Sequence, residues 1–528
     1  MQRDAIVVGA GINGLVTAAV LAKAGLKPLV VERADRVGGG AITSEIARGF
    51  RCPTLAHVAA IDQGLVRTLG LERHGLAIIR PHAHACAPSA DGRGIVLWAD
   101  SGLAAASIAA CSARDAQQYP RFLESFARVS RVVRAMNAAP PPSIDHPTAA
   151  DVIELLKTGR RFRGLGKADA YRLLRWMPMA AADLVSEWFV SEPLRATIAA
   201  GGVLGSFLGP WSAGSGALLL LLGAAEGHPI AGWQARGGAG AISDAVAAAA
   251  RHAGAEIRTG VDVREIAIDD GAATGVRLST GESIAARAVI SSADPKHTLL
   301  GLVDPMHLAP DFLRRVQNVR MHGTLAKVNY AVSSLPRFSG LATRDGAEEA
   351  AALSGRVRLN HDVDSLERAF DAAKYGGFAD EPSIELTIPS IGDSGLAPAG
   401  QHVISAYVQF APYHLRGTTW DAERDRLAET ATRTIARYAP GFESTIVARQ
   451  VITPLDLERT YGLTGGHIFH GELALDQFFI TRPLLGWARY GTPIRNLYLC
   501  GSGSHPGTGL NGQSGALAAS EILRRLRR

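Results

Sequence analysis

Two short apolar runs near the N-terminus flank a helical segment. Residues 5–8 and 29–31 have the continuous hydrophobicity that is typical of strands buried on both faces of a parallel sheet. Residues 15–24 between them have the composition of a helix, and Gly25 supplies a helix stop. The pattern predicts a strand, a helix and a second strand at the start of the chain.

The same pattern returns in the middle and at the end of the chain. Further strands are predicted at residues 256–258, 263–268, 274–278, 288–291, 325–332, 384–388, 403–410 and 497–500. Helices are predicted from the glycines at 237–240 to about residue 252, and at residues 421–438 and 514–526. Residues 102–223 are mostly helical, with a break at prolines 140–142 because such a run cannot lie inside a helix. Short buried strands at both ends and in the middle of the chain therefore alternate with long inserts.

A glycine-rich turn joins the first predicted strand to the first helix. Gly9, Gly11 and Gly14 form the spacing G-x-G-x-x-G, and Glu32 stands at the end of the second strand. In this fingerprint the glycines allow a tight turn, the approach of a pyrophosphate and close helix packing, and an acidic residue about 20 positions on binds ribose hydroxyls. The strand, the helix and the acid together predict a Rossmann-like dinucleotide site.

Composition narrows the possible functions. The net charge of +6 on 528 residues is modest, and no nucleic-acid-binding motif is present, so no nucleic-acid partner is expected. The four cysteines form no C-x-x-C pair, which argues against a metal site and a redox-active disulfide. Apolar runs fall short of the roughly 20 residues that a membrane-spanning helix needs. We therefore expect a cytoplasmic protein without metal.

Three motifs resemble one family of flavoproteins. Residues 32–39 (ERADRVGG) resemble the ERxxRxGG extension of the glutathione-reductase-type fold, as in amine oxidases and phytoene desaturases. Residues 501–509 (GSGSHPGTG), followed by Gly512, are similar to the C-terminal signature of phytoene desaturases and carotenoid isomerases. Residues 465–472 and 476–477 resemble the branch described as phytoene dehydrogenase-related or pyridine nucleotide-disulfide oxidoreductase domain proteins. The resemblance covers nearly the whole chain.

The resemblance implies FAD and an α/β fold in which the Rossmann-like FAD domain is discontinuous in sequence. FAD-binding parts are expected at residues 1–75, 231–295 and 487–528, a substrate-domain part with a helical insert at 76–230, and a mixed α/β substrate domain at 296–486. The implied cofactor-binding residues are Gly9, Gly11, Ile12, Asn13, Gly14, Glu32, Arg33, Gly39, Val263, Gly501, Ser502, Gly512, Gln513 and Ser514. A single G-x-G-x-x-G leaves no second site of the usual kind for a pyridine nucleotide.

The chain departs from the wider family at three places. Ser502 stands where many relatives carry an acid, a loss that phytoene desaturases often share. The segment 504–506 lacks the aromatic cage expected beside a flavin that oxidises amines. Gly40 and Ala41 stand where amine oxidases usually carry Gly-Arg after the glycine pair. This replacement and the missing aromatic cage favour an enzyme other than a classical amine oxidase.

Three residues are candidates for catalysis. Lys327 lies where similar proteins place a lysine that holds water near the flavin N5, and the alternative is a surface lysine on a half-buried strand. His505 lies within the flavin signature and is expected close to the cofactor, where it acts on substrate or shapes the turn. For His470 a structural role is favoured over a direct one.

A basic cluster lies in the helical insert, where Arg161, Arg163, Lys167, Arg172 and Arg175 are interleaved with aromatic and aliphatic residues. A basic amphipathic helix can lie on a membrane surface. The favoured interpretation is a solvated helix face whose apolar side packs on the protein, and peripheral membrane contact is the alternative.

The sequence therefore predicts an FAD-dependent oxidoreductase that dehydrogenates or desaturates a mostly apolar small molecule by hydride transfer to the flavin. Oxygen or a quinone-like acceptor would reoxidise the flavin. Three alternatives stay open: a C–N bond oxidase that releases peroxide, a redox-neutral isomerase, and a lipid-binding chaperone that resembles Rab GDP-dissociation inhibitors and has no flavin chemistry. The sequence names neither the substrate nor the oligomeric state.

Overall fold

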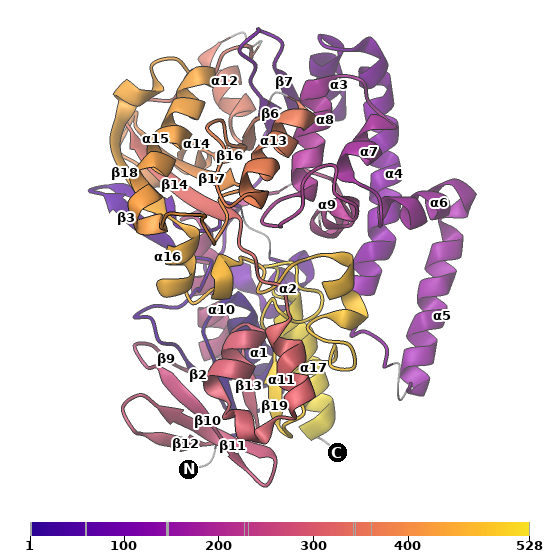
Figure 1. The fold of residues 1–528 in the computed structure, drawn as a ribbon, viewed down its shortest axis with the longest axis vertical. Coiled ribbons are helices and arrows are strands. Elements are labelled where there is room, and N and C mark those ends of the chain that lie inside the picture. Colours follow the sequence, from indigo (N-terminus) through magenta and orange to yellow (C-terminus); the bar gives the residue numbers. More distant parts are fainter. Residues whose placement is uncertain are drawn as a thin grey trace.

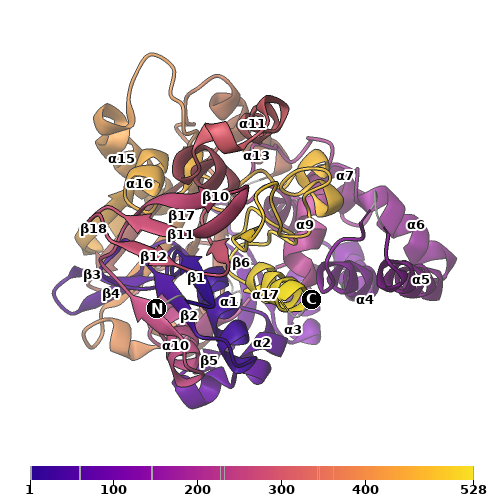
Figure 2. The same cartoon turned by 90° about the horizontal axis from the view of Figure 1, so that it is seen from below.

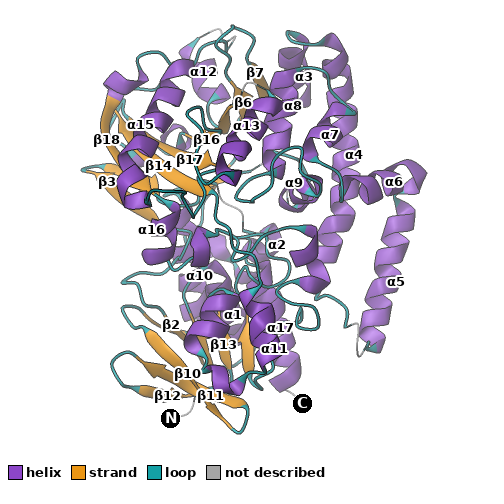
Figure 3. Cartoon of the chain, viewed as in Figure 1, coloured by secondary structure: helices purple, strands orange, loops and turns teal. Residues whose placement is uncertain are grey.

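The computed structural model describes residues 3–58, 61–143, 147–225, 227–230, 232–341, 343, 345–360 and 362–526 (Figure 1). Two sheets lie at opposite ends of its long axis, and a set of helices runs along one side (Figure 3). The fold is mixed α/β with a Rossmann-like sheet, as the sequence predicts.

The first sheet is parallel and gathers strands from three distant parts of the chain. Its order is β19 (Leu497–Leu499), β13 (Val289–Ser291), β1 (Ala5–Val8), β2 (Pro28–Val31) and β9 (Glu256–Arg258). All of these strands but β9 are wholly buried, which explains their continuous hydrophobic runs.

Successive residues of β1 point to opposite faces of this sheet. Ala5 and Val7 pack in the cluster formed with α1 (Ile12–Lys23), α10 (Ala239–His252) and α17 (Gln513–Leu526). Ile6 and Val8 pack on the other face, in the cluster that includes α11 (Pro310–Gln317) and the antiparallel sheet β10 (Val263–Asp269), β11 (Ala272–Leu278) and β12 (Ser283–Ala285). Figure 2 shows α1 and α17 side by side close to the C-terminus.

The predicted strands at 325–332 and 256–258 are found with the same bounds, and most other elements differ by one or two residues. The first helix differs more, because it begins at Ile12 inside the glycine turn and not at residue 15. Glycines in the turn lower helix propensity, which hid this first helical turn from the sequence pattern.

The second sheet has seven strands. Its order is β18 (Ile446–Ile452), β14 (Leu325–Val332), β17 (His402–Gln409), β16 (Ile384–Thr387), β15 (Arg356–Leu359), β6 (Ala83–Ala87) and β7 (Ile95–Trp98), and all neighbours are antiparallel except β15 and β6. One face packs on α15 (Trp420–Tyr438) and α12 (Gly346–Ala352) through a continuous apolar cluster. The opposite face of the seven-stranded sheet lies on the side of the dinucleotide sheet.

Shorter elements complete the fold outside the helical insert. Hairpin β3 (Thr43–Ala47) with β4 (Phe50–Pro53) packs against β14, β17 and β18, and β5 (Ile78–Ile79) pairs with β8 (Gln234–Ala235). The other α-helices outside the helical insert are α2 (Gln63–Leu69), α13 (Val363–Lys374), α14 (Pro389–Gly392) and α16 (Pro454–Arg459).

The helical insert contains α3 (Ser101–Ala109), α4 (Ala113–Asn137), α5 (Ala149–Gly164), α6 (Gly166–Trp176), α7 (Ala181–Ser186), α8 (Glu192–Ala199) and α9 (Ser215–Ala224). The break that the prolines predict lies between α4 and α5. Helices α5 and α6 stand out from the body as an arm (Figure 1).

The basic cluster spans the end of α5 and the whole of α6. The favoured interpretation, an apolar side that packs on the protein, fits only part of α6, because Tyr171 and Leu174 are exposed. Leu173 and Trp176 are buried against the insert, while Arg172 pairs with Asp169 and Arg175 pairs with Glu187. On α5 the apolar residues Val152, Ile153, Leu155 and Leu156 are exposed. In the part of the chain that the structure describes, no helix is long and apolar enough to cross a membrane. Peripheral membrane contact stays a prediction.

Close contact between α1 and α17 depends on Gly515. A Cβ atom added to Gly515 would lie 2.1 Å from the backbone oxygen of Asn13, which cannot move without distorting α1. We expect Gly515→Ala to lower the free energy of unfolding by roughly 1–3 kcal/mol. Gly159→Ala on α5 is the matched control, because a Cβ there meets nothing within 4 Å.

The control substitution should be neutral or stabilising by up to about 1 kcal/mol, since alanine is the better helix former. Urea denaturation followed by far-UV circular dichroism measures both variants. Equal stability of the two variants would contradict close packing at the α1–α17 junction.

Candidate functional site

A cavity of about 340 Å³ lies between the two sheets. Its walls come from the carboxyl ends of β1 and β2, the start of α1, strands β14, β15 and β17, and the loops at 461–470 and 508–511. Carboxyl ends of parallel strands are where α/β folds bind ligands. The cavity therefore joins the dinucleotide turn to the seven-stranded sheet.

At the dinucleotide end, the glycine turn leaves backbone N–H groups open. Gly9 has a φ of +93°, and a Cβ on Gly14 would lie 2.2 Å from the Gly9 oxygen, so both positions require glycine. Helix α1 starts at an N-cap, Gly11, that makes no side-chain cap, and its first turn holds no acidic residue. Free N–H groups and the positive end of the helix dipole suit a pyrophosphate.

Glu32 stands at the end of β2 with its carboxylate fixed by two backbone groups. Oε2 accepts from the N–H of Ala10 at 2.7 Å, and Oε1 accepts from the N–H of Ala34 at 2.9 Å. A carboxylate keeps further lone pairs after two hydrogen bonds. This geometry fits the binding of ribose hydroxyls.

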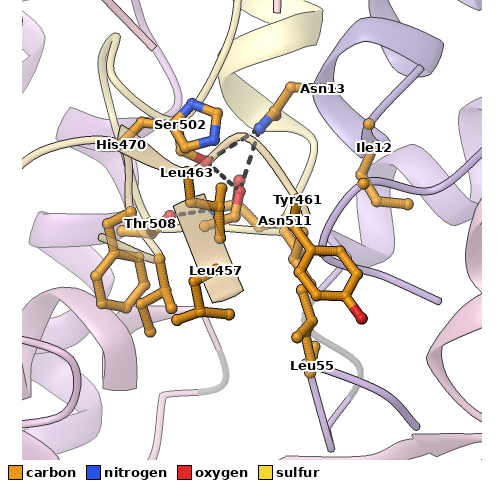
Figure 4. A pocket seen from close by; sticks show the side chains of 18 of the residues that line it. Ile12, Asn13, Leu55, Leu457, Tyr461, Leu463, His470, Ser502, Thr508 and Asn511 are labelled. Carbon is orange, nitrogen blue, oxygen red and sulfur yellow. Dashed lines mark hydrogen bonds between the residues drawn. The ribbon is translucent and has the colours of Figure 1, made fainter. Parts of the chain in front are cut away.

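Asn13 ties the first glycine turn to the C-terminal loop. Its Nδ2 donates to Ser502 Oγ and to the Gly509 carbonyl, each at 3.2 Å, and Ser502 Oγ donates to the same carbonyl at 2.8 Å. Figure 4 shows the Asn13 side chain reaching towards Ser502. Because all these groups are buried, the loop at 502–509 has one defined position relative to α1.

A buried arginine organises the same loop. Arg482 is 2% exposed and donates to the carbonyls of Ser502, Glu472, Gln477, Phe469 and Gly471. Burial lowers the pKa of this guanidinium to about 10. A buried charge is tolerated only when its donors are satisfied, and here backbone oxygens satisfy them.

Two rows of polar residues cross the cavity-facing side of the seven-stranded sheet. Directly paired residues form them: Lys327, Tyr407, Glu385 and Arg358 in one row, and Asn329, Ser405, Thr387 and Arg356 in the next. Strand side chains alternate between faces, so these residues share one face while Val328 and Tyr330 enter the apolar core behind it. Four of these residues line the cavity: Lys327, Tyr407, Arg356 and Arg358.

Hydrogen bonds and ion pairs connect the two rows. Lys327 Nζ donates to Ser405 Oγ at 2.6 Å and lies 4.3 Å from the centroid of the Tyr407 ring. Glu385 Oε1 accepts from Arg356 Nη1 at 2.7 Å, and Oε2 accepts from Arg358 Nε at 2.7 Å. Burial acts to raise the pKa of Glu385, but Arg356 and Arg358 hold it well below its usual range, so this carboxylate is ionised.

His57 closes the network from the loop after β4. Its Nδ1 lies 3.2 Å from the Ser405 carbonyl and its Nε2 lies 3.1 Å from Glu385 Oε1. Both neighbours are acceptors, so a neutral ring donates to only one of them. Burial, together with the charge of Lys327, lowers the pKa of His57 to about 3.

Lys327 is buried, with 2% exposure, so the surface-lysine alternative is wrong. Every residue of β14 is buried. One face of the strand packs in the core with α15, and the other face lines the cavity. Burial lowers the pKa of Lys327 from 10.5 to about 7, and the neighbouring Cys52 and Glu385 offset part of this shift. A lysine of this kind exchanges protons near neutral pH.

Another part of the cavity wall is apolar, apart from His228 beside Pro229. It is formed by Leu204, Leu221, Leu222, Pro229, Ile468 and Phe469. Leu221 and Leu222 belong to α9, so the leucine run of the sequence forms core and cavity wall together.

Comparison with known proteins agrees with this architecture. Residues 7–68 match the model of an NAD(P)-binding Rossmann-like domain, and residues 201–523 match that of the flavin containing amine oxidoreductases. The second match covers more than half of the chain. The protein belongs to the flavin containing amine oxidoreductase family.

Relatives within and around this family cover the full chain. Pyridine nucleotide-disulfide oxidoreductase domain-containing protein 2 of Rattus norvegicus is 36% identical over 100% of this chain and 94% of its own length. Phytoene desaturase (lycopene-forming) of Pantoea ananas is 25% identical over 99% of both chains. The structure of putrescine oxidase bound to putrescine has a TM-score of 0.61 at 17% identity, covering 99% of this chain and 100% of that one, and shows the shared fold.

Most predicted residues of this family's site lie around the cavity. Those that line it are Gly9, Gly11, Ile12, Asn13, Glu32, Arg33, Gly39, Val263, Ser502, Lys327 and His470. His470 is partly buried, its buried Nδ1 has no hydrogen-bond partner among the described residues, and desolvation lowers its pKa to about 4. Its catalytic role stays a prediction.

Other predicted residues frame the cavity without lining it. Gly501 and Gly512 permit close packing, since an added Cβ would lie 2.4 Å from the Ser292 oxygen and 2.9 Å from Leu65 Cδ1 respectively. Gln513 donates to Asp62 at 3.2 Å, and Ser514 donates to the Ser504 carbonyl at 3.2 Å. The residues of this loop that line the cavity are instead Thr508, Gly509, Leu510 and Asn511.

His505 is buried, but it is not among the cavity-lining residues. Its ring lies 5.5 Å from the ring of Phe479 and faces backbone at the end of α4, near Asn137 and Ala139. Burial lowers its pKa to about 4. Its catalytic role is untested, and this position favours the shaping of the turn.

Sequence reasoning missed the charged cluster of Arg356, Arg358, Glu385 and His57, and also Arg482. One signal was present: arginines at alternate positions of a strand otherwise made of Val and Leu place two charges on one face. The partner Glu385 could not be assigned, because it depends on the register of β15 with β16.

The depressed pKa of Lys327 predicts how the stability of the folded protein depends on pH. Its folded-state pKa, about 7, lies below the ordinary value of 10.5, so the cost of burying the charge is full below pH 7. That cost falls as the pH rises from 7 towards 10.5. We expect Lys327→Met to melt at a higher temperature than the wild type at pH 6, with the difference shrinking by pH 9.

Thermal unfolding followed by circular dichroism between pH 6 and 9 measures this difference. The matched control is Lys27→Met, which removes an exposed lysine and should follow the wild type throughout. A difference between Lys327→Met and the wild type that does not change with pH would contradict a buried, titrating lysine.

Proposed function

We propose that this protein is an FAD-dependent oxidoreductase that dehydrogenates or desaturates a mostly apolar organic substrate. The observation that supports it best is a single cavity lined both by a complete dinucleotide turn and by an apolar wall. Flavin, when bound, supplies a two-electron acceptor for a hydride from a substrate C–H bond. The second hydrogen leaves as a proton, and oxygen or a quinone-like acceptor finally takes up the two electrons.

The residues present fit FAD. The uncapped start of α1 would hold the pyrophosphate, Glu32 the adenosine ribose, and the backbone of Val263 the adenine edge. Gly39 lets its backbone approach this turn closely, since a Cβ there would lie 3.1 Å from the Gly11 Cα. Ser502 and the segment 508–511 would border the rest of the cofactor.

The chain's own residues would provide three conditions for oxidation. Leu221, Leu222 and Phe469 exclude water from the substrate side. Lys327 would hold a water molecule or exchange a proton beside the reacting carbon, because a pKa of about 7 leaves its amine partly protonated at neutral pH. The Arg482 network fixes the loop against which the cofactor lies.

Cation-rich surroundings favour dehydrogenation over amine oxidation. Three basic residues line the substrate side of the cavity, namely Lys327, Arg356 and Arg358. They would repel an alkylammonium ion. The C–N oxidase therefore ranks second despite the family's description.

Binding of FAD is the first expectation to test. We expect the purified protein to be yellow, or to take up FAD after removal of bound nucleotide. Glu32→Gln should weaken FAD binding roughly 10–100-fold, the usual effect of losing a hydrogen bond to a charged group. Quenching of FAD fluorescence measures it, and Glu443→Ala, at an exposed site on another part of the fold, is the control.

A colourless protein that takes up no FAD would overturn the proposal and favour the lipid-binding chaperone. Unchanged FAD affinity in Glu32→Gln would overturn the role of Glu32 alone.

Anaerobic mixing with candidate substrates tests the reaction. We expect apolar compounds with an oxidisable C–H bond to bleach the flavin absorption near its visible maximum, and simple amines not to do so. Bleaching by amines with peroxide release in air would support the C–N oxidase. Conversion of substrate that needs chemically reduced flavin but consumes no acceptor would support the isomerase.

A further inference from the structure

We propose that the substrate carries a carboxylate, which Arg356 binds at the sheet wall while an apolar body lies against α9 and Phe469. This inference rests on the proposed oxidation and names the chemical class of its substrate.

The position of the two arginines comes from strand geometry. Arg356 and Arg358 are two residues apart on β15 and therefore point to the same side of the sheet. Both line the cavity together with Lys327 of β14 and Tyr407 of β17, which belong to the same sheet. The charged groups are therefore part of the cavity wall, held by a sheet rather than by a mobile loop.

The cluster contains more positive than negative charge. Glu385 is ionised and balances one of the two guanidinium groups, which leaves one positive charge before Lys327 is counted. The remaining acidic residues lining the cavity, Glu32 and Asp262, are at the dinucleotide end. Buried charge without a counter-ion is costly, so this wall is complementary to an anion.

The two arginines differ in their free hydrogen-bonding capacity. Arg358 is 2% exposed and bonds to both Glu385 and the Thr197 carbonyl. Arg356 uses only Nη1, for Glu385. Its Nε is buried without a partner, and its Nη2 makes no hydrogen bond among the described residues, so Nη2 is the donor available at the cavity. Arg356 is therefore the residue with a donor left for a ligand, and guanidinium donors match a carboxylate in geometry.

The surplus charge and the apolar part of the cavity wall together indicate the chemical class of the ligand. With Lys327 neutral, the one surplus positive charge matches a monoanion, whereas an alkyl phosphate would bring nearly two negative charges and an alkylamine would bring a positive one. The opposing leucines, with Pro229, Ile468 and Phe469, suit a hydrocarbon body. An organic acid with an apolar chain satisfies both walls.

Calorimetric titration of the flavin-loaded protein tests this assignment. The ligands are octanoate, 1-octanol, octylamine and octyl phosphate, which share one chain and differ only in the head group; hexanoate and decanoate vary the chain length. We expect a carboxylate to bind at least about tenfold more tightly than the alcohol, and the amine to bind weakest. Equal binding of acid and alcohol, or tighter binding of octyl phosphate, would overturn the proposal.

Variants locate the site. Arg356→Met should weaken octanoate binding roughly 10–100-fold and leave 1-octanol unchanged, and Arg356→Lys should recover part of the loss. The control is Arg449→Met, the same substitution at an exposed position of β18 in the same sheet. Octanoate binding that survives Arg356→Met would overturn the role of Arg356.

The test separates the two proposals. Calorimetry detects octanoate whether or not the protein carries flavin, so a protein that binds no FAD refutes the oxidation while the carboxylate preference is still measured. Should Arg356→Met fail to fold, the ligand series on the wild type and on Arg356→Lys still decides the matter.

Discussion

Parallel pairing of β1 with β2 on one side and β13 on the other is the interaction on which the rest of the structure depends. It joins residues near 5, 30 and 290, and β13 then recruits β19 from near residue 498. Each strand is short and its pairing buries apolar side chains on both faces, so none is stable alone. The chain segments between these strands must start and end at fixed positions on the first sheet. This constraint places the seven-stranded sheet across the cavity from the glycine turn.

That second sheet serves two purposes because its side chains alternate. Val328, Tyr330 and their neighbours on β15, β16 and β17 form a dry core against α15. The other face holds lysine, arginine, glutamate and serine in register, where they satisfy one another across strands. A rigid, charged wall and an apolar wall thereby border the same cavity.

The C-terminal loop is held by hydrogen bonds rather than by regular structure. Asn13 fixes one side of it and Arg482 the other, and both reach Ser502. Buried networks of this kind are specific because every unsatisfied partner is penalised. The loop at 502–509, which borders the proposed cofactor position, is thus coupled to α1. Substitution of Asn13 or Arg482 should therefore disturb both halves of the site.

The sequence by itself determined the dinucleotide turn, the acid at Glu32, the family and most helices and strands, because these depend on local spacing and on backbone geometry near each residue. Only the tertiary structure decided that Lys327 is buried, that His505 lies off the cavity, and that Arg356 faces it beside Glu385. Those facts depend on strand register across long inserts and on which face each strand turns inward. No local pattern encodes that register, since a shift of one residue would send the same side chains to the opposite face.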